Sequence, residues 1–184
     1  RLGIEVTEVP ATDPANFEVY GRDENLARPW AVPGTPGLEH RIGGIEKQDI
    51  TGNINYEPEN HDRMVRLRAA KVAGVVADVP DVVPAGDPEG DVVIVGWGST
   101  FGSITSALHR LRAKGHKVGH IHLRHLNPMP KNLGAALKRY KKVLVPEINL
   151  GQLSFILRAT YLVDAISYSK VEGKPFKTME IKNK

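Results

Sequence analysis

One uninterrupted apolar run constrains the fold of this 184-residue chain more than any other feature. The segment Asp91-Val-Val-Ile-Val-Gly-Trp-Gly-Ser-Thr-Phe-Gly102 passes from apolar residues into a glycine-rich turn. Because Val92 to Val95 are apolar at every position, they predict a strand buried on both faces, as in a parallel sheet between helices. The free N–H groups of the turn indicate either an anion site or a docking edge. A helix should follow, with Ser99 or Thr100 as its N-cap and with Phe101, Ile104, Leu108 and Leu111 buried.

The same strand-and-helix unit repeats along the second half of the chain. Helices are predicted at about 100–114, 131–140 and 150–161, and Gly115 is placed to end the first of them. Strands that begin roughly two dozen residues apart are typical of βαβ units. We therefore predict a three-layer, doubly wound, mostly parallel sheet of about five strands. Its buried strands are centred near Ile94, Ile121, Leu144 and Ile166.

The first part of the chain has a different character. Frequent glycine and proline exclude a long regular element over residues 1–58. So long an irregular stretch does not fit inside a compact domain, and we expect an arm that lies across another domain or subunit. We therefore predict an irregular interdomain arm over 1–58 and an α/β domain over 59–184. The prolines of the arm are Pro10, Pro14, Pro29, Pro33 and Pro36.

A helix is expected to open the second domain. It should begin at Glu59, with Asn60 or Asp62 as its cap, and Pro80 should end it. The segment from Pro84 to Pro88 is predicted to be a turn. The buried face of this helix is expected to carry Val65, Val72 and Val79.

Composition excludes several classes of protein. No apolar run approaches the roughly 20 residues that span a bilayer, so no membrane segment is expected. The net charge of +4 is scattered, without interleaved aromatic residues, which argues against a nucleic-acid partner. The chain has no cysteine, which excludes disulfides and any iron–sulfur cluster ligated from this chain and permits a reduced, cytoplasmic setting. Since it begins at Arg1, we interpret it as a piece of a longer protein.

The glycine turn could carry chemistry of its own. It spells G-x-G-x-x-x-G over Gly96 to Gly102, a loose variant of the dinucleotide fingerprint. Where such folds place an acidic residue for the ribose, this chain has Arg124 and His125, which would suit a 2′-phosphate. An independent NADP-binding, Rossmann-like module is therefore the alternative function. The simpler interpretation is a tight turn that packs the helix on the sheet.

Four histidines lie close together in the sequence. On a strand, alternate residues share a face, so His120 and His122 could hold a divalent metal between them. No Cys, Asp or Glu lies nearby to complete the shell, and we expect a half-exposed strand and no metal. The complete group is His116, His120, His122 and His125.

Polar residues follow the second and third buried strands. Arg124, His125 and Asn127 come after the strand near Ile121, and Arg124 can offer a planar fork to an anion or make an internal salt bridge. Glu147, Asn149 and Gln152 follow the strand near Leu144 and open the next helix. Asn149 can cap that helix, with Glu147 favourably placed at its N-terminus. Since parallel strands end at one edge, these residues with Ser99 and Thr100 predict a crevice for a domain contact or ligand.

Several motifs in order resemble one enzyme family. They are the glycine-rich turn, Arg124-His-Leu-Asn-Pro-Met-Pro130 and Val145-Pro-Glu-Ile-Asn-Leu-Gly-Gln-Leu153. Together they resemble the α subunit of 2-oxoacid:ferredoxin oxidoreductases, closest to the 2-oxoglutarate branch. Pro36-Gly-Leu-Glu-His-Arg-Ile-Gly-Gly-Ile-Glu-Lys47 and Asn60-His-Asp-Arg-Met-Val-Arg66 are similar to the arm that joins the two thiamine-type domains of that subunit.

The resemblance implies the second α-subunit domain, with the fold of the transketolase C-terminal domain. In the family a pyrimidine-binding domain precedes it, and the β subunit largely holds thiamine pyrophosphate, Mg²⁺ and the iron–sulfur cluster. The reaction is the oxidative decarboxylation of a 2-oxoacid to its acyl-CoA, with coenzyme A and ferredoxin. No catalytic triad, paired carboxylates or P-loop occur in this chain. It also has no cysteine for a cluster and no Gly-Asp-Gly…Asn-Asn-type segment for a diphosphate-bound Mg²⁺. The resemblance therefore implies that it binds no cofactor itself, serves assembly and is inactive alone.

Overall fold

The computed structural model describes residues 13–184, so that Pro10 lies outside the described residues. The chain divides into two compact units, Arg1–Val75 and Val76–Lys184. This division differs from the expected boundary at residue 58, because the helix that follows the arm packs on the arm. Met64 of that helix is only 1% exposed. The amide of Asn60 donates to the Lys47 carbonyl at 2.9 Å.

The arm unit is irregular where it is described. Between residues 13 and 57 it contains one 3-10 turn, η1 (Pro14–Asn16). Two isolated bridges pair Tyr20 with Ile50 and Lys47 with Ile54. The expected absence of a long regular element is therefore confirmed for residues 13–57. That the arm lies across another domain stays a prediction.

Helix α1 (Pro58–Gly74) begins one residue before its expected start and uses neither predicted cap. The Asn60 side chain accepts from the Asp49 backbone N–H at 3.1 Å, and Asp62 pairs with Arg66 along the helix at 2.8 Å. The predicted valine face was also wrong, because Val65 and Val72 are exposed. The 3-10 turn η2 (Val75–Ala77) follows the helix, so the buried Val79 lies beyond it.

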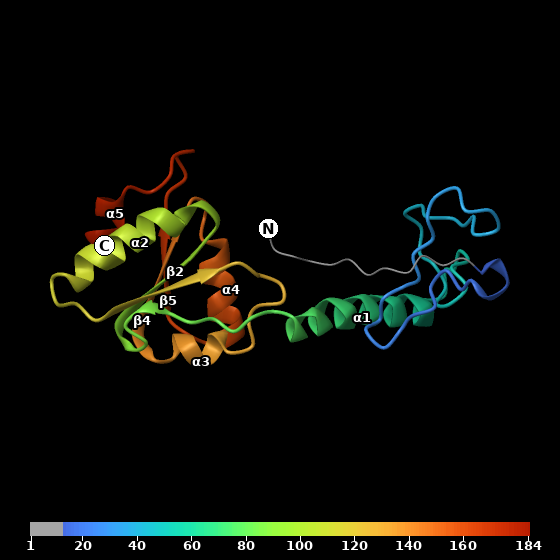
Figure 1. The fold of residues 1–184 in the computed structure, drawn as a ribbon, viewed down its shortest axis with the longest axis horizontal. Helices are drawn as coiled ribbons and strands as arrows, with labels where there is room; N and C mark the ends of the chain where they lie inside the picture. The colour runs from blue at the N-terminus through green and yellow to red at the C-terminus, as the bar shows by residue number, and fades with distance from the viewer. Residues whose placement is uncertain (1–12) are drawn as a thin grey trace. The chain divides into compact units, whose positions relative to one another are not determined.

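The second unit is built on one five-stranded sheet, in the order β1-β3-β2-β4-β5 (Figure 1). The strands β3, β2, β4 and β5 are parallel, and β1 pairs antiparallel with β3 at the edge. The predicted mostly parallel sheet is confirmed, although β1 replaces part of the expected turn after Pro84. The strands are β1 (Ala85–Gly86), β2 (Gly90–Trp97), β3 (Val118–Leu123), β4 (Tyr140–Glu147) and β5 (Ala165–Ser169).

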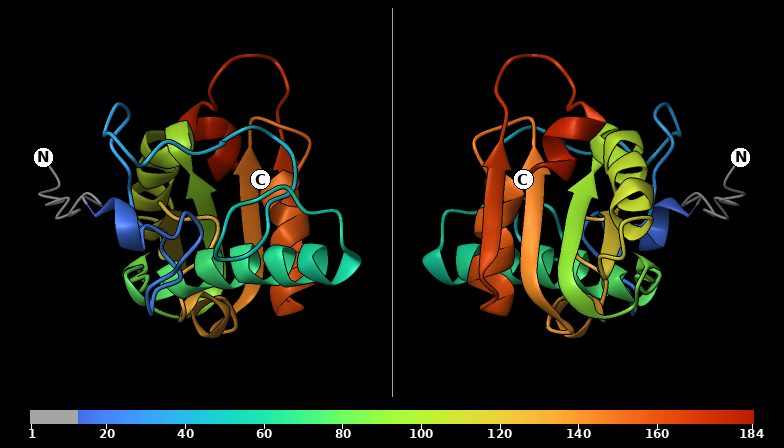
Figure 2. Two further views of the ribbon diagram at one scale, coloured as in Figure 1. Left: turned by 90° about the vertical axis from the view of Figure 1, so that its right-hand side faces the viewer. Right: turned by 90° about the vertical axis from the view of Figure 1, so that its left-hand side faces the viewer.

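Helices cover both faces of this sheet, as a doubly wound fold requires. Alternate residues of β2 serve opposite cores: Val93 and Val95 pack with α3 and α4, whereas Ile94 packs with α2 and α5. This is why the apolar run needed no alternation. Figure 2 shows β2, β4 and β5 side by side between the two helical layers. The helices are α2 (Phe101–Arg112), α3 (Leu133–Leu137), α4 (Gln152–Tyr161) and α5 (Thr178–Lys182).

None of the helices in residues 13–184 has the length and apolar character that crossing a bilayer requires.

Candidate functional site

The candidate site is the edge at which β2, β3 and β4 end, here called the carboxyl edge and made of residues 97–102, 124–130 and 147–152. In Figure 2 the arrowheads of β2, β4 and β5 lie at the same edge. The strands β2 and β4 are neighbours, but the helices that follow them pack on opposite faces. Strand order therefore reverses between them, the position at which doubly wound sheets form a binding crevice.

The glycine turn at this edge serves packing. A Cβ on Gly96 would lie 2.3 Å from Ile104 Cδ1 and 2.7 Å from Thr100 Oγ1, so a larger residue there would require the side chains of Ile104 and Thr100 to shift. Thr100 is buried, donates to the Trp97 carbonyl at 2.8 Å and accepts from its N–H at 3.2 Å. This geometry matches the simpler interpretation of the turn.

The start of α2 differs from the sequence prediction in two ways. A 3-10 turn, η3 (Gly98–Thr100), precedes the helix, and Thr100 stands at the N-cap of α2 as predicted, but its side chain makes no capping hydrogen bond. Phe101, expected in the core, is 52% exposed, whereas Ile104 and Leu108 are buried as predicted. The early 3-10 turn directs the first helical side chain outward.

Glu147 ends β4 and is fully buried, at 0% exposure. Its Oε1 accepts from Leu153 N at 2.9 Å and its Oε2 from Ser154 N at 3.1 Å. The indole Nε1 of Trp97 also donates to Oε1 at 3.4 Å, and the Asn149 amide donates to it at 3.2 Å. The sequence left two roles open for Glu147, a favourable position at the N-terminus of the next helix and a contact across the crevice. In the structure its carboxylate accepts from the N-terminal N–H groups of α4, as the first role requires, and ties the end of β2 to β4.

The N-cap of α4 is Gly151 and not the predicted Asn149, which precedes it and forms the turn before the helix. The Asn149 Oδ1 accepts from Gly151 N at 2.8 Å and from Gln152 N at 3.1 Å. Gly151 precedes α4 with a φ of 91°, a left-handed conformation that favours glycine. Gln152 itself is exposed. The loop after β4 is thus held by Glu147 and Asn149, and Gln152 remains at the surface.

The loop after β3 presents polar side chains to the surface. Arg124, His125 and Asn127 are exposed. Within residues 13–184 no ion pair of Arg124 is found, so the internal salt bridge considered for it is not observed. The parallel strands bring these residues to the same edge as Ser99 and Gln152, without side-chain hydrogen bonds between the two loops among the described residues.

His120 and His122 share a face of β3, as predicted, but the strand is buried and not half-exposed. Their ring centroids lie 6.0 Å apart, and both rings contact Phe101. Burial, and secondarily His122, lowers the pKa of His120 to about 4. Burial, then the Arg124 charge, lowers the pKa of His122. No group of three or more metal-ligating side chains occurs in the described residues. The pair is therefore a neutral aromatic cluster at physiological pH.

The carboxyl edge also carries exposed apolar residues, which the sequence did not predict as part of the site. Leu150 is 86% exposed, and Ile148 and Phe155 of the same loop and first helical turn are also exposed. Large apolar side chains gathered at one edge mark a contact surface in a soluble protein. The sequence does contain a sign of this surface. Ile148 and Leu150 alternate with polar residues in Glu147-Ile-Asn-Leu-Gly151, whereas residues of connecting loops are usually polar. The edge combines this apolar surface with the exposed Arg124.

Comparison with known proteins identifies relatives of the chain. Residues 90–178 match the family of the pyruvate:ferredoxin oxidoreductase core domain II. The chain is 55% identical, over 90% of its length, to the 2-oxoglutarate oxidoreductase subunit KorA of Mycobacterium tuberculosis. It is 34% identical, over 76% of its length, to the 2-oxoglutarate synthase subunit KorA of Methanocaldococcus jannaschii. It spans 25% of the first relative and 41% of the second.

A solved structure agrees with these relatives. The chain superposes on the 2-oxoglutarate:ferredoxin oxidoreductase of Magnetococcus marinus, bound to 2-oxoglutarate, coenzyme A and succinyl-CoA, with a TM-score of 0.81 and 38% identity. The match covers 91% of this chain and 30% of the other. Both units of the chain therefore have counterparts in that enzyme.

Proposed function

The chain belongs to the family of 2-oxoacid:ferredoxin oxidoreductase α subunits, and we propose that it forms part of the α subunit of a thiamine-dependent 2-oxoglutarate:ferredoxin oxidoreductase. Such an enzyme would oxidatively decarboxylate 2-oxoglutarate to its acyl-CoA and pass the electrons to ferredoxin. The 55% identity over 90% of the chain to a 2-oxoglutarate oxidoreductase subunit is the observation that carries the proposal. The chain spans only about a quarter of that relative's length, so further segments would complete the enzyme.

Ligand sets for the metal cofactors of the reaction are missing from residues 13–184. The sequence contains no cysteine for an iron–sulfur cluster. Residues 13–184 contain no cluster of three or more acidic or histidine ligands for a metal ion. Glu147, the fully buried carboxylate of the carboxyl edge, already accepts four hydrogen bonds. We propose that thiamine pyrophosphate, Mg²⁺ and the cluster are held elsewhere in the complete enzyme, in the cytoplasm.

The proposed role of the α/β unit is assembly. Its carboxyl edge carries exposed apolar side chains after β4 and the exposed Arg124 after β3, and apolar surface flanked by charge is typical of interfaces. We propose that this edge contacts the preceding pyrimidine-binding domain or the β subunit, and that ferredoxin meets the complete complex. The alternative function, an NADP-binding module, gains no support, because the Ile104 and Thr100 side chains fill the space next to Gly96.

The isolated chain is expected to show no 2-oxoacid-dependent reduction of a viologen dye. Thiamine pyrophosphate, Mg²⁺ and coenzyme A should not restore it, because the cofactor ligands are missing from residues 13–184. Absorbance of the reduced dye measures the result, and the complete enzyme is the positive control. Turnover above background from the purified chain would contradict the assembly role.

Arg124→Ala is expected to leave the melting temperature of the chain within about 2 °C, since the side chain is exposed. In the complete enzyme the same change should weaken subunit assembly, because a charge paired at an interface is costly to remove. Analytical ultracentrifugation measures assembly. Arg139→Ala is the matched control, because Arg139 is exposed and precedes β4, at the end of the sheet opposite the carboxyl edge. Equal assembly of both variants would remove Arg124 from the proposed interface.

A further inference from the structure

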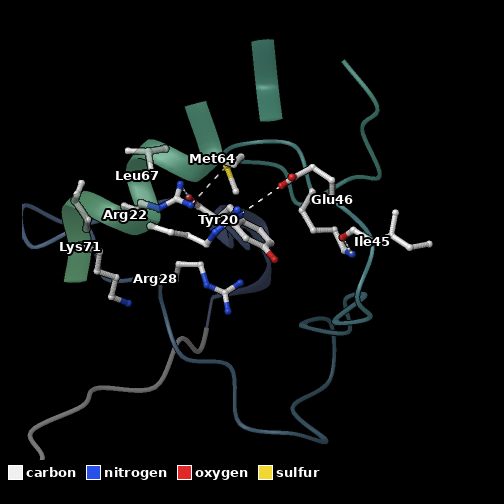
Figure 3. A pocket seen from close by; sticks show the side chains of 11 residues that line it. Tyr20, Arg22, Arg28, Ile45, Glu46, Met64, Leu67 and Lys71 are labelled. Carbon is white, nitrogen blue, oxygen red and sulfur yellow. Dashed lines mark hydrogen bonds and ion pairs between the residues drawn. The ribbon is translucent and has the colours of Figure 1, made fainter. Parts of the chain in front are cut away.

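A cavity of about 270 Å³ lies in the arm unit, between the loop after Tyr20 and helix α1 (Figure 3). Part of its wall is apolar, from Leu26, Met64 and Leu67. Its charged lining is mostly basic, with a single carboxylate, Glu46. The cations of the lining are Arg22, Arg28, Lys47, Arg68 and Lys71. They come from three separate segments of the sequence, so no single sequence motif predicts the cavity.

Two of these cations are neutralised within the arm unit. Arg22 forms an ion pair and hydrogen bond with Asp49 and also donates to the Tyr20 carbonyl at 3.0 Å. Arg68 lies 3.6 Å from the Glu46 carboxylate. The hydrogen bond from His61, followed by the Arg68 charge, lowers the pKa of Glu46, so this carboxylate is ionised and already engaged.

Three cations have no carboxylate partner among residues 13–184. Lys47 is only 3% exposed, and its ammonium donates to the Gly43 and Ile45 carbonyls at 2.8 and 2.6 Å. Arg28 stacks on the Tyr20 ring, with Cζ 4.3 Å from the ring centroid. In Figure 3, Arg28 and Lys71 lie on the opposite side of Tyr20 from Glu46. Lys47 is the buried one of the three, whereas Arg28 and Lys71 are exposed, and Arg28 also donates to the Val19 carbonyl at 3.5 Å. Positive charge that lacks a carboxylate partner favours an anion nearby.

The loop that presents Arg28 is held in a strained form. Leu26 has a φ of 60°, which side chains larger than glycine rarely adopt. The Asp23 carboxylate accepts from the N–H groups of Asn25 and Ala27 at 2.9 and 2.8 Å and so fixes the turn. Strain of this kind persists where the surroundings enforce it, and it recurs at ligand clamps. The stacked guanidinium is thus positioned before any ligand arrives.

We propose that this cavity binds the phosphate group of a small molecule. Arg28 offers a planar pair of donors and Lys71 a point charge, while Lys47 adds a buried positive charge to the lining. A phosphate matches three cations that have no carboxylate partner among residues 13–184 better than a single carboxylate does, because it carries more negative charge and more acceptor oxygens. Met64 and Leu67 receive the apolar part of the ligand. This binding activity is separate from the assembly role of the carboxyl edge.

Inorganic pyrophosphate is the probe, added to the chain of residues 1–184 at low ionic strength and followed by isothermal titration calorimetry. Arg28→Gln and Lys71→Gln should each weaken binding by about tenfold, as expected for the loss of a charge-assisted hydrogen bond. Arg41→Gln is the matched control, because Arg41 is exposed in the same unit and does not line this cavity. Circular dichroism verifies that the three variants keep the fold.

Pyrophosphate should bind more tightly than succinate, a dicarboxylate of similar size, and added salt should weaken the binding. Either the absence of pyrophosphate binding or equal weakening in Arg41→Gln would overturn the site. Succinate binding as tight as that of pyrophosphate would overturn the phosphate class. All of these outcomes are measured without oxidoreductase turnover, so they are independent of the proposed enzyme activity.

Discussion

Replacing Glu147 by alanine is expected to destabilise the α/β unit by about 3–5 kcal/mol, a large part of the stability of a domain of this size. The change removes the acceptor for the N–H groups of Leu153 and Ser154 and for the indole of Trp97. These donors surround a carboxylate that is fully buried, so they are shielded from water. Water could replace the lost carboxylate as acceptor only if the turn opened. Urea unfolding followed by far-ultraviolet circular dichroism measures the loss.

Two further variants identify the cause. Glu147→Gln keeps one acceptor oxygen but turns an NH₂ group toward a backbone donor, so it should lose an intermediate amount of stability. Gln152→Ala, at an exposed position of the same loop, should change the unfolding free energy by less than about 0.5 kcal/mol. If Glu147→Ala were as stable as Gln152→Ala, the carboxylate would not hold α4 to the sheet.

The unfolding free energy is also expected to fall by about 3 kcal/mol between pH 6.5 and pH 4 because of His120 alone. Burial lowers the pKa of this histidine from 6.5 to about 4, so the folded chain keeps it neutral. The unfolded chain takes up the proton near pH 6.5 and therefore binds more protons throughout this window. Stability is fully present above pH 6.5 and is lost as the pH falls toward the folded-state pKa.

His120→Gln should reduce this loss, since glutamine does not titrate in the window. The measurement is the unfolding free energy at several pH values for the wild type and the variant. His116→Gln is the matched control, because His116 is an exposed histidine just before the same strand. The unfolding free energy of this variant should follow that of the wild type across the pH range. A His120→Gln profile parallel to that of the wild type would refute the assignment.

The sheet could be predicted because its signal is local. Val92 to Val95 are apolar at successive positions, and successive residues of a strand point to opposite faces of the sheet. Both faces of the strand are buried only where helices cover both sides of the sheet. A role for Asn149 at the start of α4 was predictable for the same reason, since the N–H groups from which it accepts lie within three residues, although the N-cap itself is Gly151. Helix α1 was placed to within one residue at its start, yet its buried face was not, because Met64 packs against distant parts of the arm.

Side-chain partners across long stretches of sequence were decided only by the tertiary structure. Trp97 and Glu147 are 50 residues apart, and their contact exists because β2 and β4 became neighbours in a sheet whose strand order departs from chain order. The sequence by itself determined the parallel sheet, the irregular arm and the position of the carboxyl edge, since each depends on contiguous residues. Which side chains that edge buries, and which cations the arm gathers around its cavity, depend on packing between segments that no local pattern encodes.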